Sequence, residues 1–256
     1  MTAASSGGTR RLVVNADDLG QNDGVNKGIA DAVEHGIVTS TSLMVRWPAA
    51  EPAARWARDQ AGLSVGLHVD LGEWTCVAGE WQQAYEVVDT DDPEAVAAEL
   101  HRQVARFVEL MGRPPSHVDS HQHVHRSEPV GSLMVALAGE LLIPMRETTS
   151  PASYCGAFYG QYGRGQPYPE GITYEALLAV LDGLGVGVTE LGCHPGADDL
   201  ADVRSMYRSE RPVERAVLCD ARLPAALRER SVELCSFLDI GPLGTGASVA
   251  EGPRQR

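Results

Sequence analysis

Short apolar runs alternate with longer amphipathic segments along the whole chain. Residues 12–16 and 187–194 are compact apolar runs bounded by Gly, Pro or Asp, which is typical of buried strands. Residues 24–35 and 93–111 carry apolar side chains at helical spacing and end at a glycine. The predicted strands are 12–16, 37–45, 63–71, 117–121, 143–147, 187–194 and 232–240, and the predicted helices are 24–35, 49–61, 93–111, 129–141, 174–184, 210–218 and 224–230.

Strands that alternate with helices indicate a parallel sheet of the α/β class. About seven βα units follow one another without a break in composition. The pattern predicts one domain over residues 10–243, with flexible tails at 1–9 and 244–256. A TIM-barrel-like (β/α) barrel, complete or incomplete, suits this length best, and a doubly wound open sheet is the alternative.

Composition and charge narrow the class of protein. The chain has 256 residues, of which 43% are hydrophobic and 22% charged, as in globular proteins. A formal charge of −14 argues against a nucleic-acid or anionic-membrane partner, because either requires a basic face. We find no signal-peptide pattern, no apolar run of about 20 residues and no C-x-x-C pair among the five cysteines. These features predict a cytoplasmic protein with reduced thiols.

Polar residues collect where the predicted strands end, which is the face that carries the active site in a βα barrel. Each has a simpler structural role when taken alone: an Asp caps a helix, a His fills the core, an Arg lies on the surface. Five such strand ends together favour a shared site. The residues are Asp17, Asp18, His68, Asp70, the run from Asp119 to His125, Arg146 and His194.

The most specific local pattern is His117-Val118-Asp119-Ser120-His121-Gln122-His123-Val124-His125. Alternate residues of a strand share a face, so four histidines and an aspartate would be buried together if the strand continued. Such a group needs a metal or hydrogen-bond partners. We therefore expect the strand to end near His121 and the chain to turn; a solvated histidine-rich loop is the alternative. Mixed His and carboxylate ligands suit Zn, Mn, Co or Ni, whereas Mg or Ca favours an all-oxygen site.

Several motifs together resemble the YdjC/ChbG carbohydrate deacetylases. The segments that carry the resemblance are VNADDLG (14–20), GLH (66–68), HVDSHQHVH (117–125), AFYG (157–160) and CHP (193–195), with further similarity at 37–42 and 107–115. The resemblance implies a TIM-barrel-like fold and removal of an N-acetyl group from an amino sugar with one divalent metal, Mg²⁺ or Zn²⁺, with Mn²⁺, Co²⁺ and Ni²⁺ as alternatives. By matched position it implies that Asp18, His68 and His121 are metal ligands, Asp17 the general base and His194 the candidate general acid.

The chain departs from the resemblance at Gln122, where the family commonly has histidine. The ligand position beside it is intact, so we expect the change to affect substrate contacts, or the residues that support the ligands, more than metal binding. The aromatic Trp74 lies in an acidic stretch, 59–101, which holds ten Asp and Glu and no Lys or Arg. The Trp74 ring is expected either to stack on a sugar or to anchor a long loop or a dimer contact. The full set of candidates for substrate contact or for orienting the ligands is Asp70, Asp119, His123, His125, Arg146, Tyr159 and Trp74.

The chemistry agrees with this reading, because a metal held by three protein ligands keeps positions open for water and an acetyl carbonyl. The main hypothesis is a metal-dependent deacetylase of an N-acetylated amino sugar or oligosaccharide, with a homodimeric state expected by resemblance. Two alternatives remain: a non-catalytic, metal-dependent glycan-binding or regulatory protein on the same scaffold, and another barrel metallohydrolase.

Overall fold

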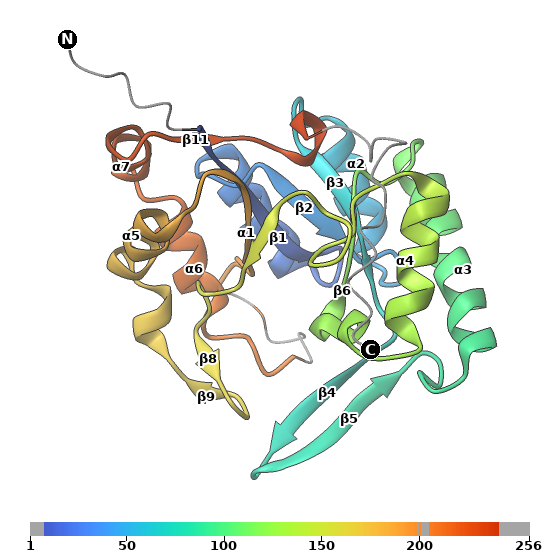
Figure 1. Cartoon of the computed structure of the whole chain (residues 1–256). Helices are drawn as coiled ribbons and strands as arrows, with labels where there is room; N and C mark the ends of the chain where they lie inside the picture. Colours follow the sequence, from blue (N-terminus) through green and yellow to red (C-terminus); the bar gives the residue numbers. More distant parts are fainter. Residues whose placement is uncertain (1–7, 199, 201–204, 241–256) are drawn as a thin grey trace, which may run out of the picture.

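A computed structural model describes residues 8–198, 200 and 205–240 of the chain (Figure 1). Residues 1–7 of the predicted N-terminal tail and the whole predicted C-terminal tail, 244–256, lie outside the described residues. Within the described part, one large apolar core lies between the sheet and the surrounding helices. No helix of this part is long and apolar enough to cross a membrane.

A parallel sheet forms the centre of the fold. Its order is β6-β3-β2-β1-β10-β7, and β11 pairs with the first residues of β1. All of its ladders are parallel, and β1 and β10 run together from Arg10–Gly187 to Ala16–Cys193. The strands are β1 (Arg10–Leu19), β2 (Ser40–Leu43), β3 (Ser64–Val69), β6 (Val118–Ser120), β7 (Ser153–Cys155), β10 (Gly187–Cys193) and β11 (Val232–Leu234).

The sheet curls into part of a barrel and does not close. Its two ends are β6 and β7, and no ladder joins them among the described residues. The strand predicted at 143–147 was wrong: only Met145 forms a bridge, with Val118. Pro144 has no N–H to donate to a ladder, and Glu147 turns the chain with a φ of 61°. The parallel α/β sheet is thus confirmed, whereas a full barrel of seven regular βα units is not.

Helices cover the outside of this sheet, as Figure 1 shows. The best-specified is α3, where the Asp92 side chain accepts from the backbone of Glu94 and Ala95, and Gly112 ends the helix at a φ of 69°. The bounds are α1 (Asp23–Glu34), α2 (Ala50–Arg58), α3 (Pro93–Met111), α4 (Val130–Leu141), α5 (Tyr174–Gly183), α6 (Arg211–Leu218) and α7 (Leu223–Glu229), with 3-10 turns η1 (His121–Arg126), η2 (Pro169–Ile172) and η3 (Phe237–Asp239).

Two antiparallel hairpins project from the same side of the molecule (Figure 1). One is formed by β4 (Gly72–Val77) and β5 (Glu80–Glu86), the other by β8 (Gln161–Tyr162) and β9 (Gln166–Pro167). Their turns touch, because Arg164 Nη1 donates to the carbonyl of Gly79 at 2.6 Å. Part of the acidic stretch 59–101 is therefore a regular hairpin.

Candidate active site

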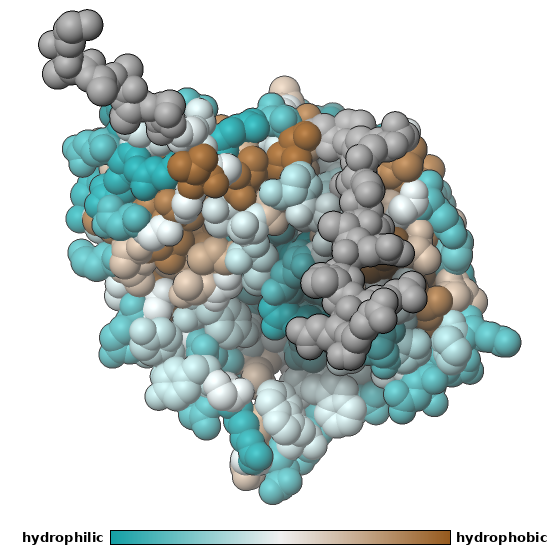
Figure 2. Space-filling view, viewed as in Figure 1, coloured by the Kyte–Doolittle hydropathy of each residue, from teal (hydrophilic) through white to brown (hydrophobic). Residues whose placement is uncertain are grey.

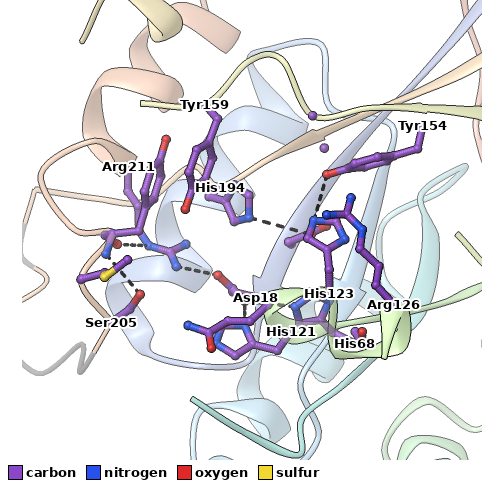
Figure 3. Close-up of a pocket in the computed structure, with 17 residues that line it drawn as sticks. Asp18, His68, His121, His123, Arg126, Tyr154, Tyr159, His194, Ser205 and Arg211 are labelled. Carbon is purple, nitrogen blue, oxygen red and sulfur yellow. Dashed lines mark hydrogen bonds and ion pairs between the residues drawn. The ribbon is translucent and has the colours of Figure 1, made fainter. Parts of the chain in front are cut away.

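A pocket of about 310 Å³ lies where β1, β3, β6 and β10 end. These are carboxyl ends of parallel strands, so side chains from distant parts of the sequence meet there. Figure 3 shows Asp18, His68, His121 and His194 directed into this pocket, with Tyr159 and Arg211 on one side of it. Most of the polar side chains predicted to share a site at the strand ends therefore meet in one pocket.

A bulge near the end of β1 brings two adjacent carboxylates into this pocket. Between Ala16 and Leu19 the strand advances three residues while its partner advances two, from Thr41 to Leu43. Asp18 has a φ of 72°, which Asp tolerates better than most residues. In a regular strand Asp17 and Asp18 would face opposite sides. Because of the bulge, both line the pocket.

Asp18, His68 and His121 form one compact group of buried donor atoms, all within 4.8 Å of one another. Asp18 Oδ1 lies 3.2 Å from His68 Nε2 and 3.0 Å from His121 Nδ1. The other oxygen, Oδ2, accepts from Arg211 Nη2 at 2.5 Å. Arg211 therefore orients Asp18 and leaves Oδ1 facing the two imidazoles.

Asp119 fixes the orientation of His68. Its Oδ1 lies 2.8 Å from His68 Nδ1, so Nδ1 carries the proton and Nε2 faces Asp18. Burial disfavours the imidazolium, but Asp119 outweighs it and raises the pKa of His68 to about 9. Against the same burial, Asp18 raises the pKa of His121 well above its usual value. The group strongly favours a positive charge at its centre.

The three residues fit a divalent metal. One carboxylate oxygen and two imidazole nitrogens make a donor set that suits Zn, Mn or Co, and the carboxylate behind His68 is the usual support of a metal-bound histidine. Two other clusters have suitable donors, but in each of them an arginine engages both oxygens of one acid: Arg146 holds Asp17, and Arg126 holds Glu147. The second acid of the Asp17 cluster, Asp119, contacts Arg146 through Oδ2 and His68 through Oδ1. Asp18 gives only one oxygen to an arginine.

Arg146 lies at the centre of a buried acidic network beside this group. Its guanidinium binds Asp17 through both terminal nitrogens at 2.7 Å and lies 2.8 Å from Asp119 and 2.7 Å from Glu190. Arg146 is 1% exposed, so the sequence alternative of a surface arginine is wrong. Although burial disfavours the carboxylate of Asp17, Arg146 holds its pKa below the usual value. Asp17 is therefore an ionised acceptor at neutral pH.

His194 stands next to Asp17, with 3.9 Å between its Nε2 and Asp17 Oδ2. Its backbone N–H donates to Glu214 Oε2 at 2.5 Å. Burial lowers the pKa of His194 to about 4, so the imidazole is neutral at pH 7. A close helix contact fixes the turn that follows, because a Cβ on Gly28 of α1 would lie 2.2 Å from Gly196 Cα.

The remaining sequence candidates divide between the pocket and its surroundings. His123 and Tyr159 line the pocket, and the Tyr159 ring lies 5.5 Å from that of His194. His125 is buried behind them, with Nδ1 2.6 Å from Ser120 Oγ. Asp70 is outside the pocket and holds the β4–β5 hairpin by accepting from Tyr85. Trp74 lies in an adjoining groove.

Several residues of the site had no recognisable signal in the sequence. Arg211 reads as an ordinary charge at the start of a helix, and Glu190 as the one acid of an apolar strand. Tyr207 and Glu214 hydrogen-bond to each other beside His194, and Tyr154 covers Arg146 at 4.9 Å from ring centroid to guanidinium. Glu190 is the exception, because a charged residue inside an apolar strand needs a buried partner and could have been recognised on that ground.

The curled parallel sheet and the buried Asp–His–His group at its strand ends define a class of α/β proteins with a carboxylate–histidine site. Within that class, the chain belongs to the YdjC-like protein family, whose model matches residues 11–229.

Two named relatives are similar to this chain in sequence over most of their length. The chain is 34% identical to a chitooligosaccharide deacetylase of Serratia marcescens, covering 90% of this chain and 98% of the relative. It is also 34% identical to a carbohydrate deacetylase of Geobacillus stearothermophilus, with the same coverage. Family membership is thus supported by whole-length similarity.

Solved structures show the same architecture. A protein of Enterococcus faecalis V583, named as a candidate cellobiose-phosphate cleavage protein, is 25% identical with a TM-score of 0.74, covering 91% of this chain and 99% of that one. A family 4 acetyl xylan esterase of Clostridium thermocellum, solved with a cobalt ion, is 13% identical with a TM-score of 0.51, covering 90% of each chain. The second likeness concerns the fold alone.

Proposed function

We propose that the protein is a metal-dependent hydrolase that removes the N-acetyl group from an N-acetylated amino sugar, such as a chitooligosaccharide. The observation that carries the proposal is the meeting, in one pocket, of a three-residue ligand group with a separate carboxylate and a separate imidazole. A protein that only binds glycans needs neither Asp17 nor His194 beside the ligands. The deacetylase names of the 34% identical relatives support the reaction class.

Asp18, His68 and His121 would hold the metal. Bound there, a divalent ion supplies a Lewis acid for the acetyl carbonyl and lowers the pKa of a water. Asp17 would accept the proton of that water, because Arg146 keeps it ionised and fixed in position. Arg211 would keep Asp18 turned toward the histidines.

His194 would deliver a proton to the leaving amine. Because its pKa is about 4, the imidazole must first receive that proton, and Asp17 Oδ2 lies 3.9 Å from His194 Nε2. We infer a relay in which the proton taken up by Asp17 passes through His194 to the amine. Protonation makes the amine a better leaving group.

Acetate release tests the proposal directly. Purified protein with added Zn²⁺, Co²⁺ or Mg²⁺ is assayed on a panel of N-acetylated amino sugars and their oligomers, and Asp17→Asn and His121→Ala are expected to abolish release. His101→Ala, at an exposed position of α3, is the matched histidine control. Substrate binding without acetate release under every metal would refute the hydrolase and favour the glycan-binding alternative. A cytoplasmic location and a homodimer belong to this proposal as further expectations.

A further inference from the structure

A groove of about 560 Å³ adjoins the pocket and has no part in the chemistry proposed above. It lies between the β4–β5 and β8–β9 hairpins. Gln122, His123 and Tyr159 line both the groove and the pocket, so the two spaces are continuous. A ligand whose reactive end occupies the pocket would therefore extend into the groove.

Two tryptophans of one hairpin face form a wall of this groove. The pairs Trp74–Gln83 and Cys76–Trp81 place residues 74, 76, 81 and 83 on the same face of the hairpin. Trp74 is 47% exposed and Trp81 46%, and Tyr162 contributes from the other hairpin. In Figure 2 most strongly apolar side chains visible on this face lie in the upper part of the molecule, and the hairpin side is mainly white to teal. Aromatic rings with polar edges, rather than an aliphatic patch, mark the groove.

The groove is formed before any ligand arrives. Gln122 ties the histidine turn to the hairpin through two hydrogen bonds with the Trp74 backbone, at 2.9 and 2.8 Å. Tyr85 anchors the hairpin base to Asp70 at 2.9 Å. The two hairpin turns are joined by the bond from Arg164 to Gly79 described above. Little conformational freedom remains to be lost when a ligand binds.

The groove also contains a buried acceptor without a partner. The Gln161 amide donates from Nε2 to Glu210 Oε1 at 2.8 Å and to Met206 O at 3.1 Å, which fixes the direction of its Oε1. Gln161 is 8% exposed, and its Oε1 has no hydrogen-bond partner among the described residues. A buried acceptor of this kind is satisfied by a ligand hydroxyl or amide N–H.

We propose that the groove binds the second pyranose ring of the substrate, so that Trp74, Trp81 and Gln161 select an N-acetylated disaccharide or longer oligosaccharide over the free monosaccharide. This inference rests on the proposed deacetylase function. A pyranose has an apolar C–H face for the tryptophan rings and hydroxyls at its edge for Gln161. One ligand of this kind accounts for the aromatic wall, for the unpaired acceptor of Gln161 and for the continuity with the pocket.

Binding measurements on a protein that does not turn over substrate test the groove. We would titrate metal-loaded Asp17→Asn protein by calorimetry with N-acetylglucosamine and with its β-1,4-linked disaccharide. The disaccharide is expected to bind about tenfold more tightly. Adding Trp81→Ala or Gln161→Leu is expected to bring the ratio of the two dissociation constants close to one, whereas Trp81→Phe retains part of it.

Trp56→Ala is the matched control, because Trp56 on α2 bonds to Glu34 at the end of α1, on the opposite end of the sheet. Equal binding of the two sugars by Asp17→Asn, or a tenfold ratio that survives in Trp74→Ala/Trp81→Ala, would overturn the groove assignment even if the wild type releases acetate. A groove-dependent ratio in a protein that never releases acetate would support the groove and refute only the hydrolase.

Discussion

Replacing Arg146 by Met removes the one cation that three buried carboxylates share. Methionine matches the aliphatic stem of arginine, so the change removes the guanidinium with its charge and donors and keeps most of the packing. Asp17, Asp119 and Glu190 each lie within 2.8 Å of the guanidinium and are all at least 97% buried at the side chain. The variant would leave them without their shared partner.

The expected loss of stability is large. Removing one partner of a buried ion pair costs about 3–5 kcal/mol, because the remaining charge stays desolvated. At about 2–4 °C per kcal/mol for a chain of this size, the melting temperature should fall by about 6–20 °C. Burial raises the pKa of Glu190 to about 7, so this acid can be protonated and keep the loss near the lower limit.

The same variant should also move the pH dependence of activity. Burial favours the neutral form of Asp17 and Arg146 opposes it, so loss of Arg146 raises the pKa of Asp17. Under the proposed mechanism, the acidic limb of kcat/KM for acetate release then shifts to higher pH.

Urea unfolding and a pH–rate profile measure the two effects. Arg55→Met is the control, since Arg55 and Glu51 form an exposed pair on α2, 3.3 Å apart, and its loss should cost less than about 0.5 kcal/mol. Our reasoning on the network fails if Arg146→Met unfolds within about 1 kcal/mol of the wild type.

Three further changes have distinct readouts. Asp119→Asn removes the carboxylate behind His68 and should weaken metal binding about 10–100-fold in a chelator competition; unchanged affinity would speak against a supporting role. Glu190→Gln should gain stability relative to the wild type as pH rises. The folded-state pKa of Glu190 is raised from 4.5 to about 7, so the stability of the wild type falls over that pH interval and that of the variant does not. The difference between the two unfolding free energies should grow by about 1–3 kcal/mol from pH 5 to 8, and a pH-independent difference would contradict this. Gln122→Ala deletes both hydrogen bonds to Trp74 and should speed amide exchange in the β4–β5 hairpin, with global unfolding within about 1 kcal/mol; unaltered exchange would show that the clamp is dispensable.

Local sequence signals predicted all seven helices of the part that the structure describes, whereas the strand predicted at 232–240 is the strand β11 over its first three residues only and ends in the 3-10 turn η3. Helix α3 was predicted with the bounds observed, since Pro93 and Gly112 mark its ends. The expected end of the strand near His121 is confirmed, as β6 ends at Ser120 and η1 follows. The β4–β5 hairpin was missed because most of its side chains are exposed or half-buried, so no alternation of apolar and polar residues marks it.

The candidate site was predictable only where a strand end carries an unusual side chain. Asp18, His68 and His121 had such positions, and the structure brings them together. Arg211 contacts Asp18 across 193 residues of sequence, and no local pattern encodes that contact. The bulge at Asp18 is likewise set by tertiary pairing, and without it a regular strand would place Asp17 and Asp18 on opposite sides.

The network around Arg146 also constrains how the chain can fold. Its acids come from residues 17, 119 and 190, so the cation meets its last partner only after β10 has joined β1. Contacts of such long range form slowly and as a unit, because much chain entropy is lost before any ion pair is gained. Docking of β10 onto β1 and burial of the carboxylates are therefore expected to occur together, and a protein that has assembled this network already has β1, β6 and β10 in place.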